Sequence, residues 1–118
     1  MFAHVNQKYP DYNFRYLEED DYHRGLFDTL GQLTKAPQPD FEAFRQHMAL
    51  MKDSSQKHVN IVGVDKNTDR VIAFGSLIIC SSTLGLLGKI ENIVTCKSVI
   101  RKGLGKCIIE LLQGEAFK

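Results

Sequence analysis

Two neighbouring runs of β-branched and aromatic residues constrain the fold of this chain most strongly. The runs are HVNIVGV (58–64) and RVIAFGSLIIC (70–80), and the polar segment DKNTD lies between them. This composition is typical of β-strands, and a short polar connection between two strands predicts an antiparallel hairpin. Because the second run is apolar on both faces of a strand, we expect it to be a central strand with helices on both sides.

The segments before the hairpin supply two of the covering helices. Apolar residues at helical spacing predict an amphipathic helix over 21–33 and a second helix that begins after Asp40. Two prolines in KAPQPD (35–40) separate the helices, since proline cannot continue a helical hydrogen-bond ladder. Asp40 is expected to cap the second helix, whose apolar stripe is a core face.

The remaining segments complete an α/β fold with a mixed sheet and three layers. We expect an irregular arm over 1–13, a short strand at NFRYL (13–17), a loop at SSTLGLLG (81–88), a strand at KIENIVTC (89–96) and a helix from about Gly103. The predicted order is β-α-α-β-β-β-α in one domain spanning 1–118.

Composition and charge exclude several classes of protein. The chain has 118 residues and a formal net charge of +1, so bulk electrostatics favours neither nucleic acid nor an anionic membrane. Its apolar runs are too short to span a bilayer, and the N-terminus lacks the layout of a secretory signal. Three widely spaced cysteines and four scattered histidines predict no metal site. We therefore expect a soluble cytoplasmic protein, another intracellular compartment being the alternative.

The segment VIRKGLGKCII (99–109) carries the clearest chemical signal. It places Gly103 and Gly105 among cations at a strand-to-helix transition. Helix N-termini favour anions, and glycine lets a backbone approach a phosphate closely. The P-loop pattern does not fit, because Cys107 rather than serine or threonine follows Gly105-Lys106. The dinucleotide-binding fingerprint does not fit either, because Ile108 stands where it requires a third glycine. The alternative is an ordinary helix start with solvated lysines.

The order of elements around this segment resembles the GNAT superfamily of acetyl-CoA-dependent N-acetyltransferases. Their cofactor motif, [QR]-x-x-G-x-[GA], matches IRKGLG at both glycines. LGQLT (30–34), GKIENIV (88–94) and RKGLGK (101–106) in this order narrow the resemblance to the eukaryotic glucosamine-6-phosphate N-acetyltransferase family, over about residues 14–118. The resemblance implies acetyl transfer from acetyl-CoA to the amine of glucosamine 6-phosphate, on the route to UDP-N-acetylglucosamine.

The resemblance also assigns roles to residues of this chain. It implies a substrate site at Thr34, Glu91 and Asn92, with Glu91 as the catalytic carboxylate that takes the amine proton. The expected cofactor-binding residues are Ile93, Val94, Thr95, Arg101, Lys102, Gly103, Leu104, Gly105 and Lys106. An acidic substitution at Gly103 or Gly105 is then expected to weaken acetyl-CoA binding without unfolding the protein. Each of two residues also has a structural alternative to its expected role. Glu91 would only form an ion pair with a nearby lysine, and Thr34 would only supply a hydroxyl at the end of a helix.

Four features depart from the family pattern. Ile100 stands at the Gln/Arg position, and Asn92 stands where the family usually has aspartate. The loop 81–87 is short and lacks the basic residue and histidine that help to hold the sugar phosphate, so Lys89 is the nearest substitute. The family domain also continues beyond the cofactor helix with further strands and a tyrosine proposed to protonate the departing thiolate.

The last departure predicts a partner. The strand over 89–96 would present an unpaired edge, so we expect a second copy of the chain, in a homodimer, or a continuation of this chain to cover it. Two other functions stay open at this point: a non-catalytic GNAT remnant that binds acetyl-CoA or dimerises, and a GNAT enzyme that acts on another amine.

Overall fold

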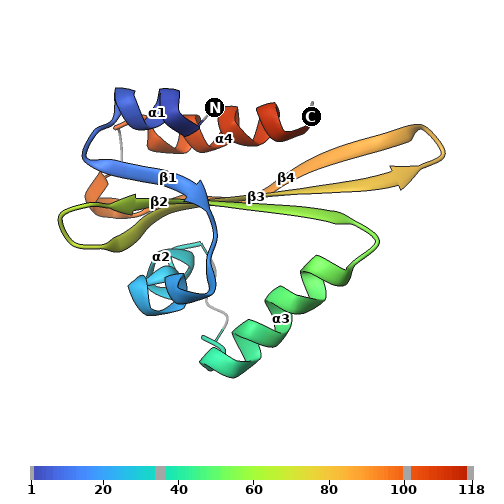
Figure 1. Cartoon of the computed structure of the whole chain (residues 1–118), viewed down its shortest axis with the longest axis horizontal. Helices are drawn as coiled ribbons and strands as arrows, with labels where there is room; N and C mark the ends of the chain where they lie inside the picture. Colours follow the sequence, from blue (N-terminus) through green and yellow to red (C-terminus); the bar gives the residue numbers. More distant parts are fainter. Residues whose placement is uncertain (1, 34–36, 100–101, 117–118) are drawn as a thin grey trace.

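A four-stranded antiparallel sheet, ordered β1-β2-β3-β4, forms the middle layer of the molecule (Figure 1). The computed structural model describes residues 2–33, 37–99 and 102–116, with Ser82 as backbone only. In chain order the elements are the helix α1 (Phe2–Lys8), the strand β1 (Tyr12–Tyr16), the 3-10 helix η1 (Glu19–Arg24), the helices α2 (Leu26–Leu30) and α3 (Phe41–Asp53), the strands β2 (Lys57–Asp65), β3 (Arg70–Ser82) and β4 (Gly85–Thr95), the 3-10 helix η2 (Lys97–Val99) and the helix α4 (Leu104–Ala116).

Helices cover both faces of the sheet, which confirms the three-layer expectation. α1 and α4 lie on one face, and α2 and α3 lie on the other (Figure 1). The strand β3 supplies side chains to both cores: Ile72 and Leu77 pack in the α4 cluster, and Val71 and Phe74 pack in the α2–α3 cluster. The two-sided apolar pattern of this run therefore identified the central strand correctly.

Several local predictions are also confirmed. β2 and β3 form the predicted hairpin, with Lys57 paired to Ile79 at its open end. Asp40 caps α3, because its Oδ1 accepts a hydrogen bond from the Ala43 N–H at 2.7 Å. α4 begins at Leu104, directly after Gly103, as the glycine punctuation indicated.

The predicted N-terminal arm is wrong, because residues 2–8 form α1. Val5 is buried against the α4 cluster. The Asn6 side chain binds the backbone of β1: its Oδ1 accepts from Phe14 N–H at 2.7 Å, and its Nδ2 donates to Phe14 O at 3.2 Å. A seven-residue helix has little stability of its own, so this helix depends on docking that no local pattern announces.

The predicted helix over 21–33 is interrupted. η1 ends at Gly25, whose φ of +78° is left-handed, and α2 then runs only from Leu26 to Leu30. Glycine adopts this conformation without the penalty that a Cβ imposes. Of the predicted apolar stripe, Tyr22, Leu26 and Leu30 pack in the α2–α3 cluster, whereas Leu33 is 48% exposed.

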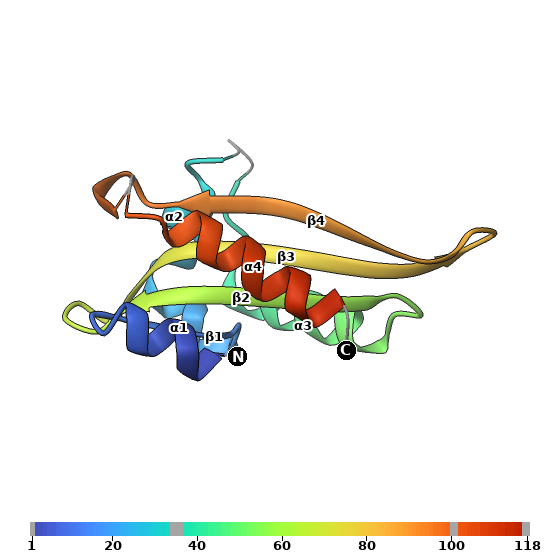
Figure 2. The same cartoon turned by 90° about the horizontal axis from the view of Figure 1, so that it is seen from above.

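The predicted loop over 81–88 is also wrong. β3 continues to Ser82 and β4 starts at Gly85, so β3 and β4 form a long hairpin whose arm extends past the rest of the sheet (Figure 2). Leu84 and Leu86 are 86% and 75% exposed near its tip. Ser, Thr and Gly favour loops, but this segment pairs with itself, Ser81 with Leu86 and Ser82 with Gly85, and only residues 83–84 form the turn.

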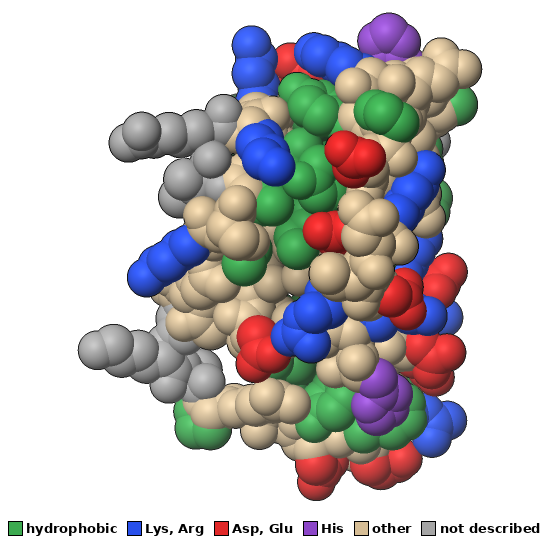
Figure 3. All heavy atoms as spheres, turned by 90° about the vertical axis from the view of Figure 1, so that its left-hand side faces the viewer, with side chains coloured by type: hydrophobic (Ala, Val, Ile, Leu, Met, Phe, Trp, Pro, Cys, Tyr) green, Lys and Arg blue, Asp and Glu red, His purple; other side chains and the backbone are tan. Residues whose placement is uncertain are grey.

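On the end of the molecule shown in Figure 3, acidic and basic side chains are interspersed. Ion pairs among the described residues include Arg70 Nη2–Asp28 Oδ2 at 2.7 Å and Arg24 Nε–Asp69 Oδ2 at 3.2 Å. Within the described residues, no helix is both long enough and apolar enough to cross a membrane.

Candidate active site

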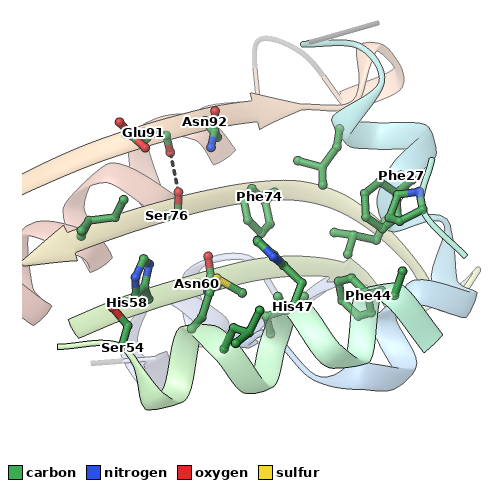
Figure 4. A pocket seen from close by; sticks show the side chains of 18 of the residues that line it. Phe27, Phe44, His47, Ser54, His58, Asn60, Phe74, Ser76, Glu91 and Asn92 are labelled. Atoms are coloured by element: carbon green, nitrogen blue, oxygen red, sulfur yellow. Dashed lines mark hydrogen bonds between the residues drawn. The ribbon is translucent and has the colours of Figure 1, made fainter. Parts of the chain in front are cut away.

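A cavity of about 800 Å³ lies between the sheet and the helices α2 and α3 (Figure 4). Its wall is largely apolar, with Phe27, Phe44 and Phe74 at one side. Its polar lining comes from three strands and one helix with its following turn. These polar residues are His47, Ser54, His58, Asn60, Ser76, Glu91 and Asn92.

A polar row crosses the sheet along the wall of this cavity. Strand register aligns Asn60 of β2 with Ser76 of β3, and Ser76 with Glu91 of β4. The Ser76 hydroxyl donates to the Glu91 carbonyl oxygen at 3.1 Å (Figure 4). Because paired residues project to the same face of a sheet, all three residues line one cavity.

A bulge interrupts β4 next to this row. Phe74 pairs with Val94 while Ser76 pairs with Glu91, so two residues of β4 lie opposite Gly75. One of them, Asn92, has a φ of +57°. Asparagine tolerates this left-handed conformation better than most residues. Bulges redirect side chains and backbone groups, and they are frequent beside active sites.

Glu91 both lines the cavity and forms an ion pair. Its Oε1 lies 2.9 Å from the Lys89 Nζ, and this hydrogen bond raises the pKa of Lys89. Lys89 is mostly exposed, whereas Glu91 is two-thirds buried. Glu91 therefore fits both the expected position at the cavity wall and the alternative, an ion pair with a lysine. Its role as proton acceptor stays a prediction.

The backbone of β4 beyond the bulge alternates between β3 and the outer edge. The Cys96 N–H donates to Ile72 O at 2.7 Å. Hydrogen bonding alternates along an antiparallel pair, so Val94 also directs its backbone groups toward β3. Ile93 and Thr95 then direct theirs to the outer edge of the strand. Of the three expected pantetheine contacts, these two have backbone groups placed for a ligand at that edge.

The N-terminus of α4 lies directly beside the end of β4. A Cβ placed on Gly105 would lie 3.5 Å from Thr95 Cγ2, so the two expected cofactor segments adjoin. The first intrahelical bond of α4 is Cys107 N–H to Gly103 O at 3.2 Å. The N–H groups of residues 104–106 precede that bond and lack helical acceptors, which suits an anion such as a pyrophosphate.

Comparisons with known proteins identify the family. No family model matches the chain. The chain is 36% identical over 104 residues to glucosamine 6-phosphate N-acetyltransferase 1 of Dictyostelium discoideum, covering 86% of this chain and 66% of that protein. It is 30% identical over 104 residues to glucosamine 6-phosphate N-acetyltransferase of Arabidopsis thaliana, covering 86% of this chain and 70% of that protein.

The chain belongs to the glucosamine 6-phosphate N-acetyltransferase family of the GNAT superfamily. The crystal structure of the Arabidopsis thaliana enzyme matches with a TM-score of 0.83 at 29% identity, covering 87% of this chain and 72% of that one. A Trypanosoma brucei acetyltransferase matches with a TM-score of 0.80 at 29% identity, covering 90% and 75%. The chain spans about two thirds of the length of the curated relatives that it matches.

Two of the residues expected from the glucosamine 6-phosphate N-acetyltransferase pattern, Thr34 and Arg101, lie outside the described residues, as does Ile100. A neighbour of Thr34 in the LGQLT segment can be placed. The Gln32 Oε1 accepts from Lys97 N–H at 3.0 Å, and its Nε2 donates to Cys96 Sγ at 3.5 Å. The end of this segment is therefore tied to the end of β4.

The expected contacts around α4 divide into exposed and buried residues. Lys102 and Lys106 are exposed, and the Lys102 Nζ donates to the Tyr12 hydroxyl at 3.3 Å. Leu104 is 1% exposed and belongs to the α4 core cluster. A ligand can therefore meet only the backbone of Leu104, while its side chain anchors the helix.

The two glycines of the motif differ, and this corrects one expectation. Gly103 has a φ of +78°, and a Cβ there would lie 3.1 Å from the Tyr9 hydroxyl. An aspartate at Gly103 would therefore strain the fold, contrary to the expectation that it would only weaken binding. Gly105 has no such strain, because its Cβ would make an ordinary contact. The clean test of the motif is at Gly105.

Sequence reasoning missed five polar residues of the cavity: His47, Ser54, His58, Asn60 and Ser76. His58 and Asn60 alternate on β2, a spacing that places both on one face of a strand. That signal was present, but it did not say which face meets α3. His47 lies on the exposed part of α3 next to the buried Met48, where a solvated surface was the natural reading.

Proposed function

We propose that this protein transfers the acetyl group of acetyl-CoA to the amine of glucosamine 6-phosphate, giving N-acetylglucosamine 6-phosphate for UDP-N-acetylglucosamine synthesis. One observation carries the proposal. A single strand, β4, places Glu91 and Asn92 in the cavity and runs within four residues to an edge that adjoins the α4 N-terminus. An acceptor in the cavity and an acyl donor along the edge of β4 would therefore meet at the bulge.

Acetyl-CoA would supply an activated thioester, and the described residues fit it at two points. The N–H groups at the start of α4 can bind its pyrophosphate, since they lack helical acceptors. The outward N–H of β4 can stabilise negative charge that develops on the carbonyl oxygen.

The transfer forms a bond between the amine nitrogen and the carbonyl carbon and breaks the carbon–sulfur bond. The amine loses one proton, which Glu91 accepts directly or through a water molecule. The sulfur departs as a thiolate, and the low pKa of a thiol makes this possible without a protonating tyrosine. The ion pair with Lys89 would fix the Glu91 carboxylate at the cavity wall.

The test is release of coenzyme A that depends on glucosamine 6-phosphate, measured with the full chain. Glu91→Gln keeps the size of the side chain and removes the base, so we expect a rate about 100-fold lower. Glu42→Gln is the matched control, because Glu42 is exposed on α3 and pairs with Arg45. A wild-type rate no higher than that in buffer would overturn the proposal.

A second candidate, acetylation of another amine, is favoured by the charges of the cavity. Neither lysine nor arginine is among the described residues that line it, and Asn92 carries no charge. A panel of amines, with glucosamine 6-phosphate included, decides between these two acceptors. A remnant that binds acetyl-CoA without turnover would instead show a cofactor-dependent rise in Tm and no coenzyme A release with any amine.

The homodimer and the cytoplasmic location stay predictions. The relatives named as glucosamine 6-phosphate N-acetyltransferases support the proposed substrate, and the exposed leucines of the β3–β4 hairpin support association.

A further inference from the structure

The bulge in β4 needs a contact that fixes its backbone. Asn92 and Ile93 lie opposite Gly75 of β3, and Asn92 has a φ of +57°. A bulge disrupts the regular ladder of strand hydrogen bonds, so the neighbouring strand restrains the peptide groups within it less. Glu91, the proposed proton acceptor, directly precedes Asn92. The group that holds this backbone therefore helps to decide where the Glu91 carboxylate points.

On the face of the sheet that α4 covers, apolar packing holds the bulge. A Cβ placed on Gly75 would overlap both Ile93 Cδ1 and Ile108 Cγ2, so these two side chains fill the space beside the glycine. Ile108 is buried in the α4 core cluster, and Ile93 packs against that cluster. Apolar contacts are non-directional. They fix the place of the Ile93 side chain, but they do not orient the peptide group between Glu91 and Asn92.

On the cavity face, a hydroxyl of β3 binds this peptide group. Ser76 is 8% exposed, and its Oγ donates to the Glu91 carbonyl oxygen at 3.1 Å (Figure 4). The peptide bond is planar and trans, so the Glu91 carbonyl and the Asn92 N–H point in opposite directions from one rigid plane. A hydrogen bond on the carbonyl therefore orients the whole peptide group, and with it the directions in which the Glu91 and Asn92 side chains leave the backbone.

The ion pair with Lys89 restrains Glu91 in a different way. It acts on the carboxylate and not on the backbone, because Lys89 Nζ contacts Glu91 Oε1. The Lys89 side chain is 73% exposed, and salt screens an ion pair in that position. The Ser76 bond acts on the backbone from a buried side chain, so it sets the orientation from which the carboxylate starts.

We propose that Ser76 is a positioning residue for the transfer reaction. This proposal rests on the proposed function and deepens it. The Ser76 hydroxyl holds the peptide group between Glu91 and Asn92, so that the Glu91 carboxylate faces the amine of the acceptor. Ser76 acts through Glu91 and takes no proton itself. Without its hydroxyl, the acceptor and acetyl-CoA still bind, but the base is held in more than one orientation.

The kinetic test compares Ser76→Ala with Ser76→Thr in the full chain. Alanine removes the hydroxyl, while threonine keeps it and adds one methyl group at the cavity wall. We expect Ser76→Ala to lower kcat with glucosamine 6-phosphate about tenfold, the effect of one hydrogen bond, with little change in either KM. Ser76→Thr should restore the rate. Ser81→Ala is the matched control, since Ser81 is an exposed serine of the same strand, paired with Leu86 in the hairpin arm.

A second readout does not depend on turnover. Relaxation dispersion of the backbone ¹⁵N nuclei reports motion on the microsecond-to-millisecond timescale. We expect the Asn92 amide to show such exchange in Ser76→Ala, because its peptide group has lost the bond that orients it. Wild type, Ser76→Thr and Ser81→Ala should show none at Asn92.

The outcomes separate this proposal from the proposed function. An unchanged kcat in Ser76→Ala, a fall that threonine does not restore, or an equal fall in Ser81→Ala would overturn the positioning role. An Asn92 amide without exchange in Ser76→Ala would overturn it as well, whether or not the chain is active. A wild-type chain that shows no acetyl transfer would overturn the proposed function, and the Asn92 amide alone would then decide whether Ser76 holds the bulge.

Discussion

At the scale of single residues, Asp21 shows how burial and pairing balance. Its side chain is fully buried and accepts bonds from Arg15 Nη2 at 2.7 Å, Arg15 Nη1 at 2.8 Å, Arg24 Nη1 at 3.1 Å and Glu18 N–H at 2.8 Å. Burial alone would raise the pKa of Asp21, but the Arg15 bonds and the backbone bond outweigh it, so the pKa is lowered. This carboxylate joins β1 to η1.

The first prediction concerns this carboxylate. Asp21→Asn leaves two arginines without their anion, and we expect a loss of about 3 kcal/mol in the free energy of unfolding. Because the folded pKa is depressed, the wild-type contribution is present above pH 4 and falls as pH drops through the folded pKa. Urea unfolding from pH 7 to pH 2 measures both effects. Asp20→Asn, at an exposed neighbour, is the control, and equal midpoints for the two variants would contradict the prediction.

At the scale of elements, α4 combines two roles in one helix. Its buried face, with Leu104, Ile108 and Leu111, packs on the sheet, while its first turn adjoins the end of β4. The dipole of the whole helix concentrates positive potential at that turn. Packing thus positions the proposed pyrophosphate site relative to the bulge in β4.

The prediction for this element compares Gly105→Asp with Gly105→Asn. Both side chains have the same size, and a Cβ fits at Gly105 without strain. We expect the aspartate to bind acetyl-CoA about tenfold more weakly than the asparagine does, since a carboxylate there repels the pyrophosphate. Titration calorimetry measures the affinities, and Tm values check that both variants fold. Equal affinities of the two variants would contradict a pyrophosphate site at the start of α4.

At the scale of the whole molecule, the β3–β4 hairpin extends beyond the layered core (Figure 2). Leu84, Leu86 and Leu87 are exposed along this arm, and β4 is the last strand of the sheet in the described part of the chain. An edge strand with apolar side chains tends to pair with another chain.

We therefore expect the chain to associate. Light scattering at micromolar concentration should give a mass above the 13.4 kDa of one chain. Leu86→Lys should shift the protein toward the monomer, because it places a charge on the exposed arm. Leu50→Lys is the control, since Leu50 is a 67% exposed leucine that lies on α3 and not on the hairpin. A wild-type monomer across this concentration range would contradict the expectation.

Much of the fold followed from local signals. The hairpin of β2 and β3, the Asp40 cap and the start of α4 after Gly103 were each predicted within a residue or two. α1, the break at Gly25 and the extended hairpin were not. α1 depends on a partner elsewhere in the chain, because Asn6 binds the backbone of Phe14, whereas the extended hairpin pairs residues close in sequence, such as Ser82 with Gly85.

The candidate site divides in the same way. Short motifs in the sequence were enough to assign Glu91, Asn92 and the Gly103–Gly105 turn to a family. The residues of such motifs keep a fixed spacing along the chain, so they can be found without the structure. His58 and Asn60 of β2 have no such spacing, and only the pairing of β2 with β3 and of β3 with β4 brings them to the cavity that Glu91 lines.

The sequence by itself determined the family, the central strand and the helix start that faces an anion, since periodicity, capping and glycine act over a few neighbouring residues. The tertiary structure alone decided which face of β2 meets α3 and where the cavity between the sheet and the helices α2 and α3 lies. Those features arise from contacts between distant segments, whose stabilisation appears only when the whole chain folds.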